Sequence, residues 1–576
     1  MSKKSKRYRG GAGAGAGISG GDPGAGACGD KVAGRPSGRP APHLPQISAP
    51  CSLHTSTLSK KSLPEPFLEM LISAVGSELA SQIKTAILET PPVISIRINP
   101  VKWTNLVAAD HPLTSNEPLT GEAATNQVPW CPAGRYLRER PNFTLDPAFH
   151  SGAYYVQEPS SMIIEILRPI VSQANSVLDL CAAPGGKSTH LATMIGGGAA
   201  AGGETAWAAA AGISSGDPGS SASARPAFGR PAARLTANEI IRSRAATLRE
   251  NISKWGDPRV TVTSLDPSAF ARRGEEFDFI LVDAPCSGEG MFRKDPDSIL
   301  EWSPRAVEEC VARQRKIVKD IWETLEPGGH LAYSTCTMNR HENEDNIDWF
   351  AQSLGANIIP LDTYLQAALP SHLQTLSDTL PSDKLSSDTL LQLQPPPEQS
   401  LDHGIIITPE GALRLHPGLV KGEGLFLALL RKPDSQSGST SPSNKIITAT
   451  SKSSKNRSLT NNPTSYLTKN RSLTNNPTSY SAKNLSSTKN AKLNSFLPDH
   501  YNALSLEYNS HYPSVELSRE MAIKYLSRET LSLPDSPVGY LRVTYCGLGL
   551  GFVKNIGSRA NNLLPTSLRI LKPGKL

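Results

Sequence analysis

The stretch SVLDLCAAPGGKS, residues 176–188, decides the fold. Its first five residues form an apolar run typical of a buried strand, and a turn of small residues follows. A helical pattern then continues through His190, Leu191 and Ala192. A small-residue turn between a parallel strand and a helix lets a ligand approach the backbone at the carboxyl edge of a sheet. The stretch therefore predicts a strand, a ligand-binding turn and a helix.

Two classes of ligand compete for this turn. Gly186-Lys187-Ser188 matches the end of a P-loop, but that motif needs a Gly five positions before its last Gly, where this chain has Cys181. A nucleoside cofactor needs instead a carboxylate at the end of the next strand, where it can bind ribose hydroxyls. Glu239 ends the run RLTANE at 234–239. The sequence therefore favours a nucleoside cofactor over a nucleoside triphosphate.

The spacing of the two motifs supports this interpretation once an insertion is removed. Glu239 lies 53 residues after Gly186, whereas about 20 are expected. Removing the 35 low-complexity residues 196–230 leaves 18. Asp266 follows a further strand pattern at 259–264 and is a candidate contact for an adenine amino group, although an acidic residue there is also an ordinary turn former.

Four tracts of low complexity divide the chain: 1–62, 196–230, 369–400 and 433–497. The last one contains KNRSLTNNPTSY twice, at 455–466 and 469–480. Because such tracts have too few apolar residues to offset chain entropy, we expect them to be disordered. Three folded domains remain, at 63–155, 156–432 and 498–576.

The three domains have different patterns. Residues 63–155 combine helical periodicity between 67 and 79 with a strand at 93–98. Residues 156–432 alternate strands with amphipathic helices, which predicts an α/β, Rossmann-like parallel sheet. In residues 498–576 the runs 540–545 and 548–554 predict a hairpin that turns at Cys546-Gly547. Both flanking domains are therefore predicted to be α+β.

Composition excludes several other classes. The formal charge is +7, but the first ten residues carry +5 and residues 435–498 carry +9, so the remainder carries +7 − 14 = −7. Eight widely spread cysteines without a C-x-x-C pair argue against a disulfide framework and a structural zinc site. No apolar run reaches 18 residues, and Gly/Ala repeats follow the basic N-terminus, so neither a membrane span nor a secretory signal is expected. We expect a reduced, cytoplasmic protein.

Two further strands each lead to a cysteine. The strand pattern 277–282 runs into DAPCSGEG at 283–290, and the pattern 330–334 runs into Thr335-Cys336-Thr337, after a helix at 305–325 that LEPGG (325–329) closes. Parallel strands place Cys286 and Cys336 at the edge that carries the cofactor turn. A thiolate there suits covalent catalysis if its pKa is lowered, and Lys187 is a candidate neighbour. Cys310, within the helix, is predicted to be structural.

The three segments CAAPGGKS (181–188), DAPCSGEG (283–290) and STCT (334–337) resemble the signature motifs of the Sun-type RNA (cytosine-5) methyltransferases. The segment GAYYVQEPSSM at 152–162 is similar to that family as well. VPWC at 128–131 and the C-terminal segments LRVTY (541–545) and GFVKN (551–555) resemble the bacterial branch called ribosomal RNA small-subunit methyltransferase F. The insertions depart from the family's pattern.

The resemblance implies a mechanism in which a thiolate adds to C6 of cytosine, so that C5 can attack the methyl group of S-adenosyl-L-methionine. It gives Cys336 the role of nucleophile, Cys286 that of assisting product release, and Asp283 that of contacting the cytosine. The residues that it implies for the cofactor are Cys181, Ala182, Ala183, Pro184, Gly185, Gly186, Lys187, Glu239, Asp266 and Asp283.

The resemblance also implies a partner. The substrate is expected to be RNA, most readily ribosomal RNA or a pre-ribosomal particle, and its target base must leave the stack to reach the pocket. The flanking domains are expected to bind RNA, the C-terminal one as a PUA-like domain, and the chain is expected to be a monomer. A catalytically silent RNA-binding or ribosome-assembly factor on the same fold is the alternative. The candidate basic or polar contacts are Arg97, Asn99, Lys102, Arg542, Lys554, Arg559, Arg569 and Lys572.

Overall fold

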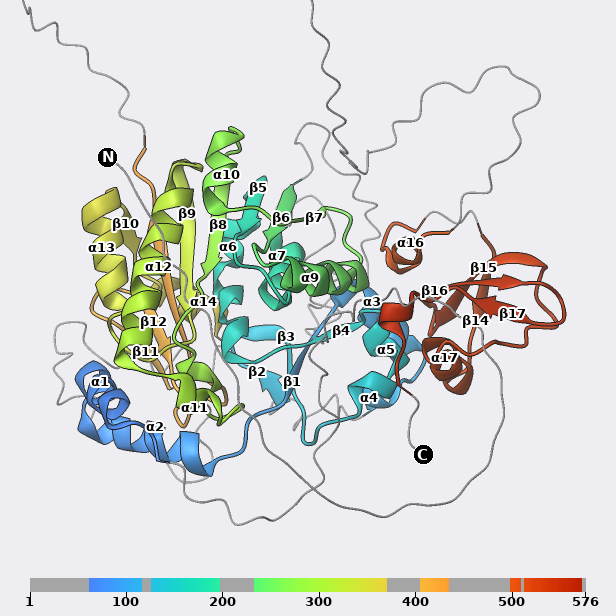
Figure 1. The fold of residues 1–576 in the computed structure, drawn as a ribbon, viewed down its shortest axis with the longest axis horizontal. Coiled ribbons are helices and arrows are strands. Elements are labelled where there is room, and N and C mark those ends of the chain that lie inside the picture. The colour runs from blue at the N-terminus through green and yellow to red at the C-terminus, as the bar shows by residue number, and fades with distance from the viewer. Residues whose placement is uncertain are drawn as a thin grey trace, which may run out of the picture. The chain divides into compact units, whose positions relative to one another are not determined.

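A computed structural model describes residues 62–115, 126–196, 233–369, 404–434, 498–508 and 512–571 (Figure 1). Apart from border residues, the tracts predicted to be disordered (1–62, 196–230, 369–400 and 433–497) lie outside these described residues. The described residues all belong to one compact unit. No helix among them is long and apolar enough to cross a membrane.

The central feature is a nine-stranded sheet in the order β11-β12-β13-β9-β8-β5-β6-β7, with β10 paired to β13. Five strands form a parallel path, namely β9 (Leu325–Thr335), β8 (Phe277–Asp283), β5 (Ser176–Asp179), β6 (Arg234–Asn238) and β7 (Val260–Thr263). The predicted Rossmann-like α/β core is therefore present. The sheet is nevertheless mixed, because β13 (Leu425–Arg431) pairs antiparallel with β9, β12 (Leu413–Leu415) and β10 (Asn357–Ile359), and β11 (Ile405–Ile407) pairs antiparallel with β12.

Alternation along the strands supplies the two faces of this sheet. Phe279 and Leu281 of β8 pack on one face with α7 (Gly186–Met194), whereas Ile280 and Val282 pack on the other face with α12 (Pro304–Trp322) and α13 (Glu344–Leu354). Successive strand side chains point to opposite faces, so a strand covered on both faces reads as one continuous apolar run. Such continuous apolar runs are the pattern from which the strands of this sheet were predicted.

The remaining helices of this domain lie between or beside its strands. They are η3 (Ser160–Leu167), α6 (Arg168–Val171), α9 (Arg242–Trp255), α10 (Pro267–Arg272), η4 (Glu289–Met291), α11 (Ser298–Glu301) and α14 (Asp362–Ala368). One predicted boundary was wrong. We expected a helix to continue to Leu325, but α12 ends at Trp322 and Leu325 already begins β9, since Pro327 and Gly328 form a bend inside the strand rather than a stop for the helix.

The N-terminal domain has a sheet of its own, in the order β2-β3-β1-β4. Its elements are α1 (Glu65–Val75), α2 (Ser77–Glu89), β1 (Ser95–Ile98), α3 (Pro100–Ala108), α4 (Pro112–Ser115), β2 (Gln127–Val128), β3 (Cys131–Tyr136), η2 (Phe143–Leu145), α5 (Pro147–His150) and β4 (Tyr154–Val156). The predicted helical periodicity and the strand at 93–98 correspond to α1, α2 and β1.

The C-terminal part has a four-stranded sheet, β14-β15-β16-β17. Its elements are α16 (His500–Leu504), β14 (Ser514–Glu516), α17 (Arg519–Leu526), β15 (Gly539–Tyr545), β16 (Leu548–Asn555), β17 (Ala560–Asn562) and η6 (Thr566–Leu568). The predicted hairpin is confirmed, because β15 and β16 pair antiparallel around Cys546 and Gly547. Both turn residues have positive φ, 50° and 72°, as a two-residue hairpin turn requires.

Candidate active site

The sequence-predicted site residues lie where β5, β6, β8 and β9 end. The turn 181–188 follows β5, Glu239 follows β6, Asp283 closes β8 and Cys336 follows β9. Parallel pairing holds these ends level, since Asp179 is opposite both Ala237 and Leu281, and Asp283 is opposite Ser334. The structure thus brings these residues to one sheet edge.

Neighbouring side chains fix the cofactor turn through its carbonyl groups. Arg244 donates to the Ala183 carbonyl at 2.9 Å, Asn251 donates to the Pro184 carbonyl at 2.9 Å, and Arg97 donates to the Gly186 carbonyl at 3.2 Å. The first N–H groups of α7 have no partner inside the helix, so they can face a ligand. Gly185, with φ 115°, makes the reversal into the helix, and this left-handed conformation favours glycine.

Glu239 is the carboxylate expected to bind ribose. It is 3% exposed, and its Oε1 accepts a hydrogen bond from the backbone N of Ile241 at 2.9 Å. Its Oε2 lies 3.2 Å from Arg244 Nη1. Because Arg244 also holds the cofactor turn, one guanidinium couples the predicted ribose contact to that turn.

Asp266 is exposed, in contrast to the buried Glu239. It is the N-cap of α10, where its Oδ1 accepts from the backbone N of Ser268 at 3.1 Å. The hydrogen bonds from Ser268 lower the pKa of this carboxyl. The structure therefore gives Asp266 the turn-forming role that the sequence left open beside adenine binding.

Asp283 connects the cofactor turn to the cysteine strands. Its Oδ1 accepts from Ser334 Oγ at 2.7 Å, and its Oδ2 lies 2.9 Å from Lys187 Nζ. Burial alone would lower the pKa of the Lys187 ammonium, but the Asp283 carboxylate raises it above its ordinary value, and Cys336 also contributes to raising it. Lys187 therefore stays charged and interacts electrostatically with Cys336, while its assignment as the neighbour that activates a thiol stays a prediction.

The two predicted cysteines are in contact. Their Sγ atoms lie 3.2 Å apart, and both residues are half-buried and free. The hydrogen bond to Cys336, together with burial, raises the pKa of the Cys286 thiol well above its ordinary value. Cys286 is thus a thiol that holds its proton more tightly than an ordinary cysteine does. Cys310 lies in α12, also as predicted.

Sequence reasoning missed two polar residues of this edge. Asp179, at the end of β5, is fully buried; its Oδ2 accepts from Ser188 Oγ at 2.6 Å, while its Oδ1 has no partner within the described chain. Asn238 joins three strand ends, since its Nδ2 donates to the carbonyls of Leu180 and Leu265. The signal for Asp179 was a carboxylate as the last residue of a buried strand.

Three expected RNA contacts near the first strand are corrected. Arg97 is fully buried beneath the cofactor turn, with its guanidinium 4.6 Å from the Trp255 ring, and Asn99 caps α3. Lys102 Nζ donates to the carbonyls of Ser151, Lys254 and Leu504 at 2.7, 2.7 and 2.9 Å. Buried polar groups must be hydrogen-bonded. These three side chains are internal supports and present no surface to RNA.

The C-terminal basic residues divide into two groups. Arg542 is also a support, because it donates twice to the Ala503 carbonyl and stacks over Tyr508 at 4.1 Å. Lys554, Arg559 and Arg569 are exposed and stay predicted RNA contacts. Lys572 lies outside the described residues.

One buried cluster in the described chain contains metal-ligating residue types: Cys131, Glu165 and His190. Glu165 already accepts a hydrogen bond from His190 at 2.6 Å and is paired with Arg168 at 2.5 Å. Burial opposes ionisation of Glu165, but Arg168 and His190 lower its pKa to about 2. The carboxylate is thus neutralised by protein groups, and the absence of a metal stays a prediction.

The unpaired Asp179 Oδ1, the buried Glu239 and the turn 181–188 together fit a nucleoside cofactor that carries positive charge. A Rossmann-like sheet with such an edge and two adjacent thiols defines the class of S-adenosylmethionine-dependent methyltransferases.

Comparisons with known proteins narrow this class. Three family models match: 16S rRNA methyltransferase RsmB/F over 214–431, the N-terminal domain of 16S rRNA methyltransferase RsmF over 63–159, and the methyltransferase RsmF PUA domain over 512–570. The chain therefore belongs to the RsmB/F family of RNA methyltransferases, whose cofactor is S-adenosyl-L-methionine. The predicted PUA-like character of the C-terminal part is confirmed.

Individual relatives agree with the family models. Ribosomal RNA small subunit methyltransferase F of Cronobacter sakazakii is 32% identical over 390 residues, which cover 67% of this chain and 66% of the relative. The protein of the same name in Salmonella agona is 29% identical over 541 residues, which cover 89% of this chain and 97% of the relative. A crystal structure of a methyltransferase homolog protein from Pyrococcus horikoshii is 22% identical, with a TM-score of 0.40, covering 64% of this chain and all of that one.

Proposed function

We propose that this protein methylates C5 of a cytosine in small-subunit ribosomal RNA through a covalent adduct between Cys336 and C6 of the base. The observation that carries this proposal is the contact between two thiols, 3.2 Å apart, beside the Asp283–Lys187 ion pair. The names of the family and of the relatives supply the class of RNA.

The nucleophile in this proposal is Cys336. C5 of cytosine is a poor nucleophile until the ring is made electron-rich. When the Cys336 thiolate adds to C6, sulfur supplies the electron pair of the new S–C6 bond. The C5–C6 π pair then forms a C4–C5 π bond and the C4–N3 π pair moves to N3, so that C5 becomes the nucleophilic carbon of an enamine. Asp283, held by Ser334 and Lys187, would contact the N3 side of the base. The Lys187 ammonium that pairs with Asp283 supplies the positive charge that offsets the negative charge developing on the ring.

The cofactor side orients the second reactant. S-adenosyl-L-methionine supplies an electrophilic methyl group when bound. The turn 181–188, Glu239 and Asp266 are the residues that would hold it, with Asp283 near the methyl-donating end. Asp179 would place a buried negative charge beside this site.

Product release requires two bonds to break after transfer. The C5–H proton must leave, and the S–C6 pair must return to sulfur so that the C5–C6 double bond forms again. Cys286 touches Cys336 and keeps its proton in the resting site because its pKa is raised by that contact. Once Cys336 is bound to the base, this contact no longer raises the pKa, and Cys286 can give its proton to solvent. The Cys286 thiolate then accepts the C5 proton while the S–C6 pair returns to Cys336, and we assign Cys286 to this release step.

Transfer of tritium from labelled cofactor into RNA, followed by bisulfite sequencing to locate the mark, tests the proposal. We expect Cys336→Ala to reduce transfer to the level without enzyme, because no adduct can form. Cys310→Ala is the matched control, since Cys310 is a cysteine of α12 rather than of the edge, and it should keep transfer. Normal turnover of Cys336→Ala would remove the nucleophile assignment, and binding of RNA without any transfer by the wild type would favour a silent assembly factor.

The release role has a separate test. We expect Cys286→Ala to accumulate a protein–RNA adduct that survives denaturant and appears as a shifted band on a gel, because the adduct forms but is not resolved. Its absence, with transfer retained, would contradict the role of Cys286. The cytoplasmic location and the monomeric state stay predictions.

A further inference from the structure

Two buried carboxylates lie directly behind the thiol pair, one on each loop that carries a cysteine. Glu289 belongs to the Cys286 loop (residues 284–290), and Glu342 belongs to the Cys336 loop (residues 336–343). Their exposed fractions are 1% and 0%. Each carboxylate reaches across to the loop of the other cysteine.

Glu289 holds the backbone of the Cys336 loop. Its Oε2 accepts from the backbone N of Met338 at 2.6 Å and from that of Asn339 at 3.2 Å. Its Oε1 accepts from Trp302 Nε1 at 3.1 Å, which anchors the carboxylate to the protein core.

Glu342 makes the reverse connection. Its Oε2 accepts from the backbone N of Ser287, the residue after Cys286, at 3.0 Å. The same oxygen accepts from Gln314 Nε2 of α12 at 2.7 Å. Burial raises the pKa of Glu342, and the nearby Glu289 raises it as well, while these hydrogen bonds oppose the shift.

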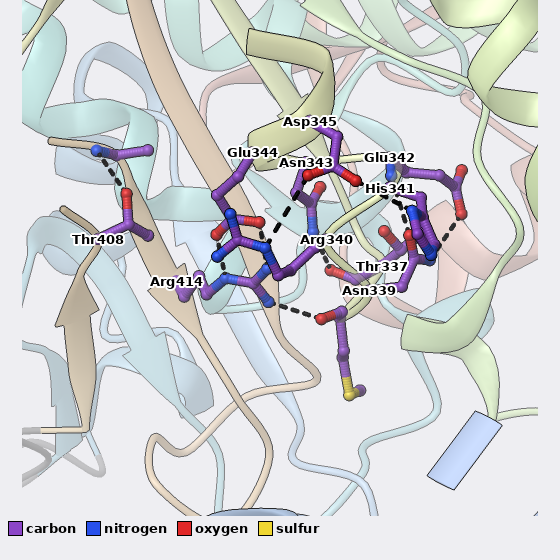
Figure 2. Close-up of polar contacts among 12 residues, drawn as sticks. Thr337, Asn339, Arg340, His341, Glu342, Asn343, Glu344, Asp345, Thr408 and Arg414 are labelled. Atoms are coloured by element: carbon purple, nitrogen blue, oxygen red, sulfur yellow. Dashed lines mark hydrogen bonds and ion pairs between the residues drawn. The ribbon is translucent and has the colours of Figure 1, made fainter. Parts of the chain in front are cut away.

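Asn339 joins the two carboxylates. Its Nδ2 donates to Glu289 Oε1 at 2.7 Å. The same Nδ2 donates to Glu342 Oε1 at 2.9 Å, and Asn339 Oδ1 accepts from the backbone N of Glu342 (Figure 2). Each of the four carboxylate oxygens of Glu289 and Glu342 therefore accepts at least one hydrogen bond. We call Glu289, Asn339 and Glu342 the clasp.

A second layer supports the clasp from outside. Figure 2 shows Arg414 paired with Glu344, and Arg414 Nη1 also donates to the Met338 carbonyl at 2.6 Å. The two loops are packed closely against each other. A Cβ on Gly290 would lie 2.6 Å from the Cys336 carbonyl oxygen and 2.8 Å from the Cys336 Cβ.

Stability alone does not account for this arrangement. Two carboxyl groups are buried close together, and well-packed apolar side chains of similar volume are often as stable as buried ionisable groups or more so. The carboxylates instead restrain the positions of the two loops. Glu289 holds the backbone of the Cys336 loop, and Glu342 holds the backbone of the Cys286 loop. Covalent catalysis is sensitive to such placement, since a shift of about 1 Å can reduce a rate by about 100-fold.

We propose that Glu289, Asn339 and Glu342 are positioning residues that set the separation of the Cys286 and Cys336 thiols, so that Cys286 can resolve the adduct formed by Cys336. This inference rests on the proposed function for its catalytic consequence. The separation of the thiols can be measured without RNA.

The first experiment uses phenylarsine oxide, whose arsenic bonds to two adjacent thiols while its oxygen leaves with both thiol protons as water. We expect the wild type to bind one equivalent through Cys286 and Cys336, identified by mass spectrometry and lost in Cys286→Ala. In Glu342→Gln an amide N–H₂ would face donors, so we expect affinity to fall about tenfold or more, as misplacement of reacting groups predicts. Glu342→Asp, which keeps the charge, should restore part of it.

Glu165→Gln is the matched control, because Glu165 is also a buried carboxylate, and its hydrogen-bond partners are Arg168 and His190 rather than residues of either loop. It should lower the melting temperature and keep arsenical affinity. Wild-type affinity in Glu342→Gln and Glu289→Gln would overturn the clasp, as would failure of the wild type to bind the arsenical.

The second experiment measures turnover. We expect Glu342→Gln to accumulate a denaturant-resistant RNA adduct, as Cys286→Ala does, with a lower kcat and unchanged KM for cofactor and RNA. A raised KM with no adduct, in a variant that folds, would show a structural role only and overturn the proposal. If Cys286→Ala also forms no adduct, the release role of Cys286 fails, and normal turnover of Cys336→Ala would remove the covalent mechanism. The arsenical result still decides the clasp in either case.

Discussion

The two halves of the catalytic edge differ in how completely the protein satisfies its own polar groups. In the cysteine half, at the ends of β8 and β9, Glu289 and Glu342 accept hydrogen bonds on all four oxygens. In the cofactor half, at the ends of β5, β6 and β7, Asp179 Oδ1 has no partner in the described chain, and Asp266 is exposed.

This difference indicates which half of the edge has its side chains held in position before substrate binds. A carboxylate whose oxygens all accept hydrogen bonds has a fixed position, whereas a buried oxygen without a partner is destabilising until a ligand supplies one. We infer that the cysteine half is preorganised by the protein, and that the cofactor half reaches its lowest free energy with the cofactor bound. Substitutions in the two halves should therefore fail in different ways.

The largest effect is expected from Gly290→Ala, in the cysteine half. Its Cβ would lie 2.6 Å from a backbone oxygen of Cys336, so one loop must move and the thiols must separate. We expect kcat to fall about 100-fold, the scale given by a displacement of about 1 Å, with cofactor affinity unchanged by calorimetry.

Gly288→Asn is the control in the same loop. Nothing lies within 4 Å of a Cβ at Gly288, whose φ is +84°, and Asn tolerates this left-handed conformation better than most residues. It should keep kcat within a few-fold. Equal losses in both variants would mean that loop strain, rather than thiol spacing, controls the rate.

A smaller effect is expected from Asp179→Asn, in the cofactor half. Burial raises the pKa of Asp179 to about 7, while Ser188 and Lys187 oppose the shift. The ionised carboxylate should bind a positively charged cofactor, so wild-type affinity should rise between pH 6 and pH 8. The Asn variant should bind about tenfold more weakly at pH 8, as expected for loss of a charged hydrogen bond, and its affinity should not depend on pH in this range.

The same substitution has an opposite consequence for the stability of the free protein. Between pH 4 and pH 7 the native carboxyl keeps a proton that the unfolded chain has released, so the free energy of unfolding falls as pH rises through this window. Asp179→Asn should remove this fall, measured by denaturant titration at pH 5 and pH 8.

Asp257→Asn is the control for the pH dependence of cofactor affinity. Asp257 is a buried carboxylate paired with Arg259, and its substitution should leave that pH dependence unchanged. If it does not, Asp179 is not its source.

The sequence predicted the residues of the catalytic edge better than the buried residues that hold this edge in place, and the reason is physical. Cys286, Cys336 and Asp283 follow apolar strands directly, and parallel strands bring their carboxyl ends together whatever the rest of the fold does. Glu289 and Arg97 could not be assigned in this way. A charged residue in a loop or short strand is usually solvated, and only the tertiary structure shows that these two are buried and hydrogen-bonded to neighbouring elements.

The smallest effect is expected at Asp266, the exposed carboxylate that follows β7 in the cofactor half. The residue caps α10 and is also the proposed adenine contact. Ser keeps the capping oxygen but is too short to reach a ligand, so Asp266→Ser should separate these roles. A hydrogen bond that an exposed carboxylate accepts from a neutral amino group contributes about 0.5–1 kcal/mol, so we expect cofactor affinity to fall about twofold to fivefold, with an unchanged melting temperature. Asp266→Ala should lose the same affinity and, in addition, about 1 kcal/mol of stability. Unchanged affinity in Asp266→Ser would confine Asp266 to its capping role, and the cofactor half would then end at β6.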